Sequence, residues 1–207
     1  MAIDKNVVIQ TALVLLDEVG SDGLTMRALA KALNVQAPTL YWHFPSKQDL
    51  LEQMADALIA PVLRNVNVNA APDDVLRSLA GALRAALLSR RDGARIYAGT
   101  YVMGDNVLGV AEIALGALLR KGIDACEATD AMFNLVYYVL GFTIEEQGFD
   151  RRWSEKSEGS SVRRQFLGAT EGRFPNLSRN LDAILTNSFD NRFASGLTAL
   201  LYTHPFR

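Results

Sequence analysis

The sequence is poor in the residues on which most enzyme and metal sites depend. It has one cysteine, Cys126, and two histidines, His43 and His204, among 207 residues. A single cysteine cannot form a disulfide within the chain, which fits a reducing compartment, and we expect it to be buried. No Cys-X-X-Cys, His-X-X-Glu, Gly-X-Ser-X-Gly or glycine-rich phosphate-binding motif occurs, and Glu145 and Glu146 are adjacent on a predicted helix, so they point to different faces. The sequence therefore indicates a protein that is not an enzyme and needs no metal or cofactor.

Long apolar runs are missing too. Hydrophobic residues make up 49% of the chain and charged residues 21%, as in an ordinary globular protein. No run approaches the roughly 18 apolar residues that would suggest a membrane span, and the N-terminus lacks the apolar segment of a signal peptide. We expect a cytoplasmic protein that does not associate with a membrane.

A general excess of basic residues is also absent, since the net charge is −2. The charges are unevenly distributed, however. Residues 23–48 contain no aspartate or glutamate but include Arg27, Lys31 and Lys47. This local basic balance supports a nucleic-acid contact in that segment.

Apolar residues recur at spacings of three and four almost throughout, and no strand pattern is apparent, so the chain is predicted to be all-α. We expect an N-terminal three-helix helix-turn-helix DNA-binding domain (1–45), a connecting helix (46–64) in which Pro61 introduces a kink or an end, and a larger helical ligand-binding and dimerisation domain (65–207). Predicted helices cover residues 4–19, 25–33, 38–43, 46–61, 73–87, 92–101, 106–121 and 124–147. A surface loop at 150–175 and two C-terminal helices follow.

Residues 25–43 have the pattern of a helix-turn-helix. Thr25 can cap a first short helix, Asn34-Val35 can turn, and Pro38 suits the first turn of a recognition helix. The alternative is that Tyr41 and Trp42 are core aromatics and that this is an ordinary helix start. We favour the DNA-binding interpretation because the capped helix after Ser46 also fits. The expected DNA contacts are Thr25, Met26, Arg27, Gln36, Ala37, Pro38, Thr39, Tyr41, Trp42, His43 and Lys47.

The stretch GLTMRALAKALNVQAPTLYWHFPSKQDLL (23–51) resembles the DNA-binding region of the TetR family, and TLYWH with Lys47 four residues later is similar to its tetracycline repressors. A second stretch, LLSRRDGARIYAGT (87–100), resembles the effector-domain segment that carries drug-contacting residues. The resemblance implies a repressor that binds a palindromic double-stranded DNA operator as a homodimer and is released by a small-molecule inducer.

The second stretch departs from the tetracycline repressors at the positions that bind the drug. Those proteins hold a drug–magnesium chelate through a histidine where this chain has Tyr97, and their asparagine, glutamine and arginine match Leu79, Ala114 and Tyr101. Glu145 matches an acid that helps hold metal-bound water. The resemblance thus implies a pocket for a hydrophobic, aromatic or polycyclic molecule without metal, although the same residues could instead fill a solid core. The expected effector contacts are Leu63, Leu79, Leu83, Tyr97, Thr100, Tyr101, Val102, Met103, Ala114 and Leu118.

Two expectations concern partners. A helical DNA-binding regulator with no small-molecule effector, controlled by a protein partner, stays open as an alternative function. We expect a homodimer because the last helices carry apolar stripes that one protomer cannot bury alone. These stripes comprise Leu177, Leu181, Leu185, Phe193, Leu197, Leu200 and Leu201.

Overall fold

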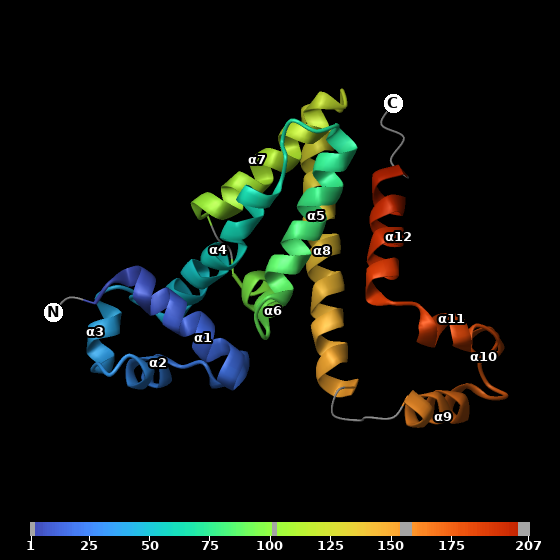
Figure 1. Cartoon of the computed structure of the whole chain (residues 1–207), viewed down its shortest axis with the longest axis horizontal. Coiled ribbons are helices and arrows are strands. Elements are labelled where there is room, and N and C mark those ends of the chain that lie inside the picture. Colours follow the sequence, from blue (N-terminus) through green and yellow to red (C-terminus); the bar gives the residue numbers. More distant parts are fainter. Residues whose placement is uncertain (1–2, 101–102, 154–158, 203–207) are drawn as a thin grey trace. The chain divides into compact units, whose positions relative to one another are not determined.

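The computed structural model describes residues 3–100, 103–153 and 159–202, with the side chains of 150–162 excluded. No strand occurs within these ranges, which confirms the all-α prediction. The helices, drawn in Figure 1, are α1 (Lys5–Gly23), α2 (Met26–Ala32), α3 (Ala37–Tyr41), α4 (Lys47–Asn65), α5 (Pro72–Leu88), α6 (Gly93–Ala98), α7 (Asp105–Arg120), α8 (Ala125–Trp153), α9 (Gly159–Thr170), α10 (Pro175–Arg179), α11 (Leu181–Thr186) and α12 (Phe189–Tyr202). The chain divides into two compact units, Met1–Gln147 and Gly148–Pro205.

Local capping signals explain where the first helices begin. Asp4 accepts a hydrogen bond from the Asn6 amide (2.7 Å) at the start of α1, and Thr25 accepts one from the Ala28 amide (3.1 Å) at the start of α2. Such side-chain oxygens satisfy amides that have no partner inside the helix. Gly20 interrupts α1 with φ 71°, a conformation that glycine adopts without steric cost.

The longer α4 begins with a reciprocal capping box. Ser46 accepts from the Asp49 amide (3.1 Å), and the Asp49 carboxylate accepts from the Ser46 amide (2.9 Å). Pro61 lies inside α4, which continues to Asn65, so the proline does not end this helix.

One hydrophobic core joins the N-terminal helices to the rest of the first unit. Helices α1, α2 and α3 lie around the first part of α4 (Figure 1), and Leu16, Leu40 and Phe44 are fully buried among them. Ile96 of α6 belongs to the same cluster, and Tyr97 packs against it. The helix-turn-helix core therefore includes a residue that comes from the middle of the chain.

Helices α4, α5 and α7 pack against one another in the remainder of the first unit. The apolar stripe of α5 is buried there, including Leu76, Leu79 and Leu83. α8 is tied to α5 by an ion pair between Arg84 and Glu146 (2.5 Å). This bundle is the scaffold for the candidate effector region.

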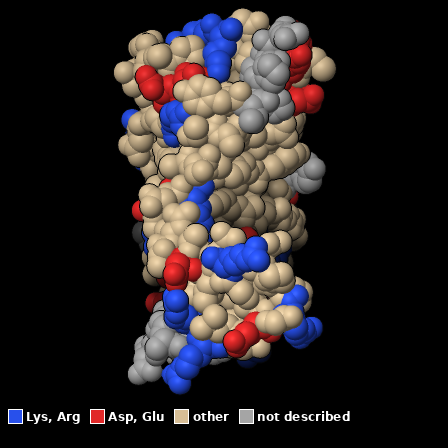
Figure 2. Space-filling view, turned by 90° about the vertical axis from the view of Figure 1, so that its right-hand side faces the viewer, with Lys and Arg blue, Asp and Glu red and all other residues tan. Residues whose placement is uncertain are grey.

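The second unit contains the end of α8 and helices α9 to α12. Arg163 of α9 pairs with Asp182 of α11 (2.7 Å), and Ser178 of α10 donates to the Thr170 carbonyl (3.3 Å). α12 carries no charged residue from Phe193 to Tyr202. Figure 2 accordingly shows a mostly uncharged surface over α12 and charged side chains gathered around α9 to α11.

Several sequence expectations are corrected by the structure. The surface loop predicted at 150–175 contains α9, and α8 runs on to Trp153 rather than ending at Gln147. The polar composition of this stretch hid the helix, although its arginine, glutamine and leucine residues are good helix formers. Cys126 is exposed, not buried.

The apolar stripes of the last helices are less open than the sequence predicts. Leu181, Phe193 and Leu197 are already buried within the single chain, whereas Leu177 is exposed. Leu185, Leu200 and Leu201 are half-buried. Only part of the predicted stripes therefore lacks apolar cover.

Among the described residues, no helix is both long and apolar enough to cross a membrane.

Two aromatic residues that follow the recognition helix, two positions apart, test which side of this segment faces the core. Phe44 is 0% exposed and Trp42 is 89% exposed. Phe44→Ala should lower the free energy of unfolding by about 3–5 kcal/mol because it opens a cavity in the shared core. Trp42→Ala should change it by less than about 0.5 kcal/mol. Urea titrations followed by circular dichroism measure both, and equal losses in the two variants would contradict this assignment of faces.

Candidate DNA interface and effector region

The recognition helix α3 turns its apolar residues inward and its aromatic C-terminal end outward. Leu40 is fully buried, while Tyr41 and Trp42 are 49% and 89% exposed. The alternative that both aromatics belong to the core is therefore wrong. The exposed rings of Tyr41, at the end of α3, and Trp42, at its C-cap, are accessible to a partner surface.

The turn before α3 is set by backbone geometry at Asn34. This residue has φ 53°, in the left-handed region where asparagine is enriched among non-glycine residues. The Val35 amide then donates back to the Ala30 carbonyl (3.0 Å), which closes the turn. Pro38 lies in the first turn of α3, as the sequence predicts.

The other predicted DNA contacts differ in exposure. Arg27, Gln36, Pro38 and Lys47 are exposed, and so is Thr25, whose hydroxyl also caps α2. Ala37, Thr39 and His43 are half-buried, whereas Met26 is only 7% exposed and belongs to the core. Two cations and two aromatics of the helix-turn-helix segment, Arg27, Lys47, Tyr41 and Trp42, are thus exposed.

Four of the ten predicted effector residues lie on α5 and α7, which pack together. Leu79, Leu83, Ala114 and Leu118 are buried. Leu63 of α4 lies against Gly109 of α7, where a β-carbon in place of the glycine hydrogen would come within 2.9 Å of the leucine methyls.

The remaining predicted effector residues are less enclosed. Tyr97 and Thr100 are half-buried, and the Thr100 hydroxyl donates to the Tyr97 carbonyl (2.9 Å). Met103 is 83% exposed, so the single chain does not enclose it. Tyr101 and Val102 lie outside the described residues.

A carboxylate in α4 organises the start of α7. Asp56 accepts from the amides of Asn106 (3.0 Å) and Val107 (3.1 Å), and from the Asn106 side chain (2.7 Å). The residue at the N-cap of α7 is Gly104, which has no side chain to do this. Sequence patterns give no sign of this role for Asp56, because its partners are 50 positions away.

Asp56 also affects the phenol of Tyr97. Burial of Tyr97 and, to a smaller extent, the negative charge of Asp56 raise the pKa of the phenol above 10.0. Both effects disfavour the phenolate. Tyr97 is therefore a neutral hydroxyl group at physiological pH.

The effector domain also contains an ion pair that the sequence does not predict. The Arg84 Nε donates to Glu146 Oε2 (2.7 Å), and a second nitrogen donates to Oε1, so the pair is bidentate. The guanidinium lies 5.6 Å from the centre of the Phe142 ring. The two side chains are only 13% and 9% exposed, and such a pair is costly to break because each partner would be left charged and buried.

The turn between α5 and α6 is fastened to the end of α1. Asp17 accepts from the Arg90 side chain (2.6 Å) and the Arg91 amide (2.9 Å). Asp92, which is 4% exposed, accepts from the Ser21 amide (2.9 Å). A β-carbon on Gly20 would lie 3.1 Å from the Asp92 carboxylate, so this close approach also favours glycine.

The same turn is held from α8 by Gln147. Its amide group donates to the carbonyls of Leu87 (3.2 Å) and Arg90 (2.9 Å), and its oxygen accepts from the Ala94 amide (3.2 Å). We call the turn with its partners Asp17, Ser21 and Gln147 the α5–α6 junction. It connects the end of α1 directly to α5, α6 and α8.

No group of three or more histidine, cysteine, aspartate or glutamate side chains placed to hold a metal ion occurs in the part of the chain that the structure describes.

A short capped helix, a left-handed turn and an exposed recognition helix define a helix-turn-helix DNA-binding protein. Comparison with known proteins gives the family. The model for "Bacterial regulatory proteins, tetR family" matches residues 8–54, and that for "Tetracyclin repressor-like, C-terminal domain" matches residues 71–202. The chain belongs to the TetR family, and it is a DNA-binding transcriptional repressor, not an enzyme.

Individual relatives support this assignment. The chain is 38% identical to the tetracycline repressor protein class A from transposon 1721 of Escherichia coli, over 96% of this chain and 89% of that protein. A crystal structure of a TetR variant from Acinetobacter baumannii AYE in complex with minocycline matches with a TM-score of 0.75 and 36% identity, over 96% and 92% of the two chains. BioQ with its double-stranded DNA operator matches with a TM-score of 0.65 and 33% identity, over 74% and 94%.

The raised pKa of Tyr97 predicts a specific alkaline effect. The folded chain keeps this phenol protonated to a higher pH than the unfolded chain does, so its contribution to stability is complete below about pH 10 and is lost as the pH rises through the folded pKa. Tyr97→Phe should therefore lose less stability than the wild type between pH 8 and pH 11. Urea midpoints at both pH values measure this, with Tyr41→Phe as an exposed control. Equal losses in the wild type and Tyr97→Phe would refute the prediction.

Proposed function

We propose that this chain is a ligand-released repressor that binds a palindromic DNA operator through the residues named above on α2, α3 and the start of α4. The main support for this DNA contact is that Arg27, Trp42 and Lys47 are exposed while Leu40 is buried. Cations at such positions contact phosphates, and aromatic side chains contact phosphates or thymine methyl groups. Residues 1–45 form the DNA-binding domain, 46–64 the connecting helix and 65–207 the effector and dimerisation domain.

The repressor acts as a homodimer, so that two recognition helices enter successive major grooves about 34–36 Å apart. Support comes from the partly covered apolar surfaces of the second unit, such as Leu177 and the uncharged length of α12 (Figure 2). BioQ, a relative, binds a double-stranded operator.

The inducer is a hydrophobic, aromatic or polycyclic molecule that binds near α5, α6 and α7 without magnesium. The Acinetobacter relative binds minocycline, which is also a polycyclic molecule. The buried Leu79 and Ala114 stand where the tetracycline repressors have amide side chains, and Tyr97 stands in place of their histidine. A charged magnesium chelate would lose its hydration among these residues and find few polar groups to replace it. This desolvation would cost several kcal/mol of binding free energy.

Release from DNA follows from the α5–α6 junction. A ligand that binds one arrangement of α6 more tightly shifts the population by its differential affinity. Because Ile96 of α6 is part of the helix-turn-helix core, a shifted α6 alters the packing of the recognition helix.

A substitution at the start of α4 tests the DNA contact. Lys47→Ala should weaken binding on specific and random duplexes alike, and it should reduce the slope of log K against log salt by about 0.9, because one phosphate contact is lost. Lys121→Ala removes the same charge far from this motif in the sequence and serves as the control. Fluorescence anisotropy at several salt concentrations measures both. An unchanged slope in Lys47→Ala would show that Lys47 does not contact a phosphate.

Calorimetry tests the ligand class. Tetracycline titrated with magnesium should bind weakly or not at all, and excess EDTA should make no difference, since Tyr97 stands where the tetracycline repressors have their magnesium-binding histidine. Micromolar binding that disappears when EDTA is added would contradict the proposal. Tyr97→His should not restore magnesium dependence, because Leu79 and Ala114 still offer no hydrogen-bonding group.

Sedimentation equilibrium tests the assembly. A dimer at micromolar concentration is expected, because dimer interfaces of this kind bury large apolar surfaces. A stable monomer in that range would exclude the homodimer.

A further inference from the structure

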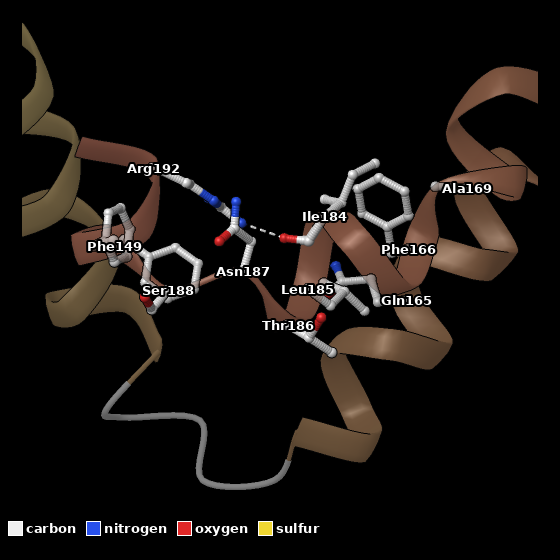
Figure 3. A pocket seen from close by; sticks show the side chains of 11 residues that line it. Phe149, Gln165, Phe166, Ala169, Ile184, Leu185, Thr186, Asn187, Ser188 and Arg192 are labelled. Atoms are coloured by element: carbon white, nitrogen blue, oxygen red, sulfur yellow. Dashed lines mark hydrogen bonds between the residues drawn. The ribbon is translucent and has the colours of Figure 1, made fainter. Parts of the chain in front are cut away.

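The second unit contains a partly open cavity of about 560 Å³ that the proposed repressor function does not use. Figure 3 shows its walls, which come from the end of α8, from α9, from the end of α11 and from the start of α12. All of the lining residues belong to the second unit, and none of them is among the residues expected to bind the inducer. Its volume lies within the roughly 300–1,000 Å³ typical of small-molecule sites.

Most of the wall is aromatic or aliphatic. Phe149 and Phe189 meet edge to face, with ring centres 5.2 Å apart and an angle of 64° between the planes. Phe166, Ile184 and Leu185 line the opposite side in Figure 3. A ligand with an aromatic or alkyl body could bury substantial apolar surface against these groups.

Arg192 is the one charged residue among the described residues that line the cavity. Its guanidinium lies 5.6 Å from the centre of the Phe189 ring and donates a hydrogen bond to the Ile184 carbonyl. Figure 3 shows this side chain reaching from α12 toward α11. These contacts fix the orientation of the guanidinium, whose planar array of five donors suits a carboxylate.

Neutral polar groups lie beside the arginine. Gln165, Thr186, Asn187 and Ser188 complete the lining. Amide and hydroxyl groups of this kind can donate to a second carboxylate oxygen without adding negative charge. The cavity therefore combines an apolar wall, one fixed cation and neutral hydrogen-bonding groups.

We propose that this cavity is a second ligand site, which binds a small aryl- or alkyl-carboxylic acid. The apolar body lies against Phe149, Phe166 and Phe189, and the carboxylate is held by Arg192. A neutral molecule of the same shape loses the charge-assisted hydrogen bond, and an inorganic anion lacks the apolar body. The proposal concerns the second unit alone, and its test does not depend on the inducer site.

A matched pair of probes tests the site. 4-Phenylbutyrate and 4-phenylbutan-1-ol differ mainly in the charged end, and isothermal titration calorimetry with the full chain compares them. The acid should bind with a submillimolar Kd, and the alcohol should bind about ten-fold or more weakly, which is the usual contribution of a hydrogen bond to a charged group.

Two cavity variants and two controls locate the binding. Arg192→Gln should weaken binding of the acid about ten-fold and so remove the difference in affinity between the acid and the alcohol. Arg179→Gln, the same change at an exposed position of α10, should leave both affinities unchanged. Ala169→Phe places a ring in the cavity without altering Arg192 and should abolish binding of both probes, even if Arg192→Gln fails to fold. Arg120→Gln, at an exposed position of α7 in the other unit, should leave both affinities unchanged.

Amide chemical shifts of the labelled chain complete the test. Titration with 4-phenylbutyrate should move the signals of residues 184–192 and leave those of 79–118 in place. The proposal is overturned by equal affinity for acid and alcohol, by shifts confined to 79–118, or by no binding at millimolar concentration. Loss of binding in Ala169→Phe accompanied by a changed sedimentation mass would also overturn it, because the cavity would then be part of an interface between copies.

Discussion

The turn at residues 87–94 is the constraint on which the arrangement of the first unit depends. A turn that reverses the chain inside a helical bundle leaves main-chain groups without helical partners, and burying them unpaired is costly. Here Gln147 satisfies the carbonyls of Leu87 and Arg90 and the amide of Ala94, while Asp17 satisfies the amide of Arg91. Three segments that are far apart in sequence therefore meet at this turn.

The position of α6 follows from this turn and links the two functional regions. Ile96 contributes to the core of the helix-turn-helix, and the neighbouring Tyr97 packs against that core while its phenol experiences the charge of Asp56. Asp56 in turn caps α7 through the amides of Asn106 and Val107. A displacement of α6 cannot be confined to the effector domain, because close-packed side chains transmit a shift to their neighbours.

The sequence predicts well the features whose causes are local. Thr25, Pro38 and Ser46 act within three or four residues of their own positions, so the helix-turn-helix and its boundaries could be derived directly. The partners of Asp56, Glu146 and Gln147 lie about 50 to 60 positions away, and their roles depend on how the helices pack, which periodicity does not specify. Helix α9 is not predicted from the sequence for a different reason: its polar composition is typical of a loop.

The long-range polar contacts also bear on the chemistry of the effector region. The carboxylate of Asp56 accepts hydrogen bonds from the start of α7, and that of Glu146 accepts them from Arg84. The amide of Gln147 donates to the α5–α6 turn. Binding a magnesium chelate through any of these groups would first require breaking a contact that supports the fold, at a cost of about 1–3 kcal/mol for each group left unsatisfied. A hydrophobic ligand avoids this cost, because it needs only to displace or cover apolar side chains such as Leu63, Leu79 and Leu83. The same contacts that fix the architecture therefore support the proposal that the inducer binds without magnesium.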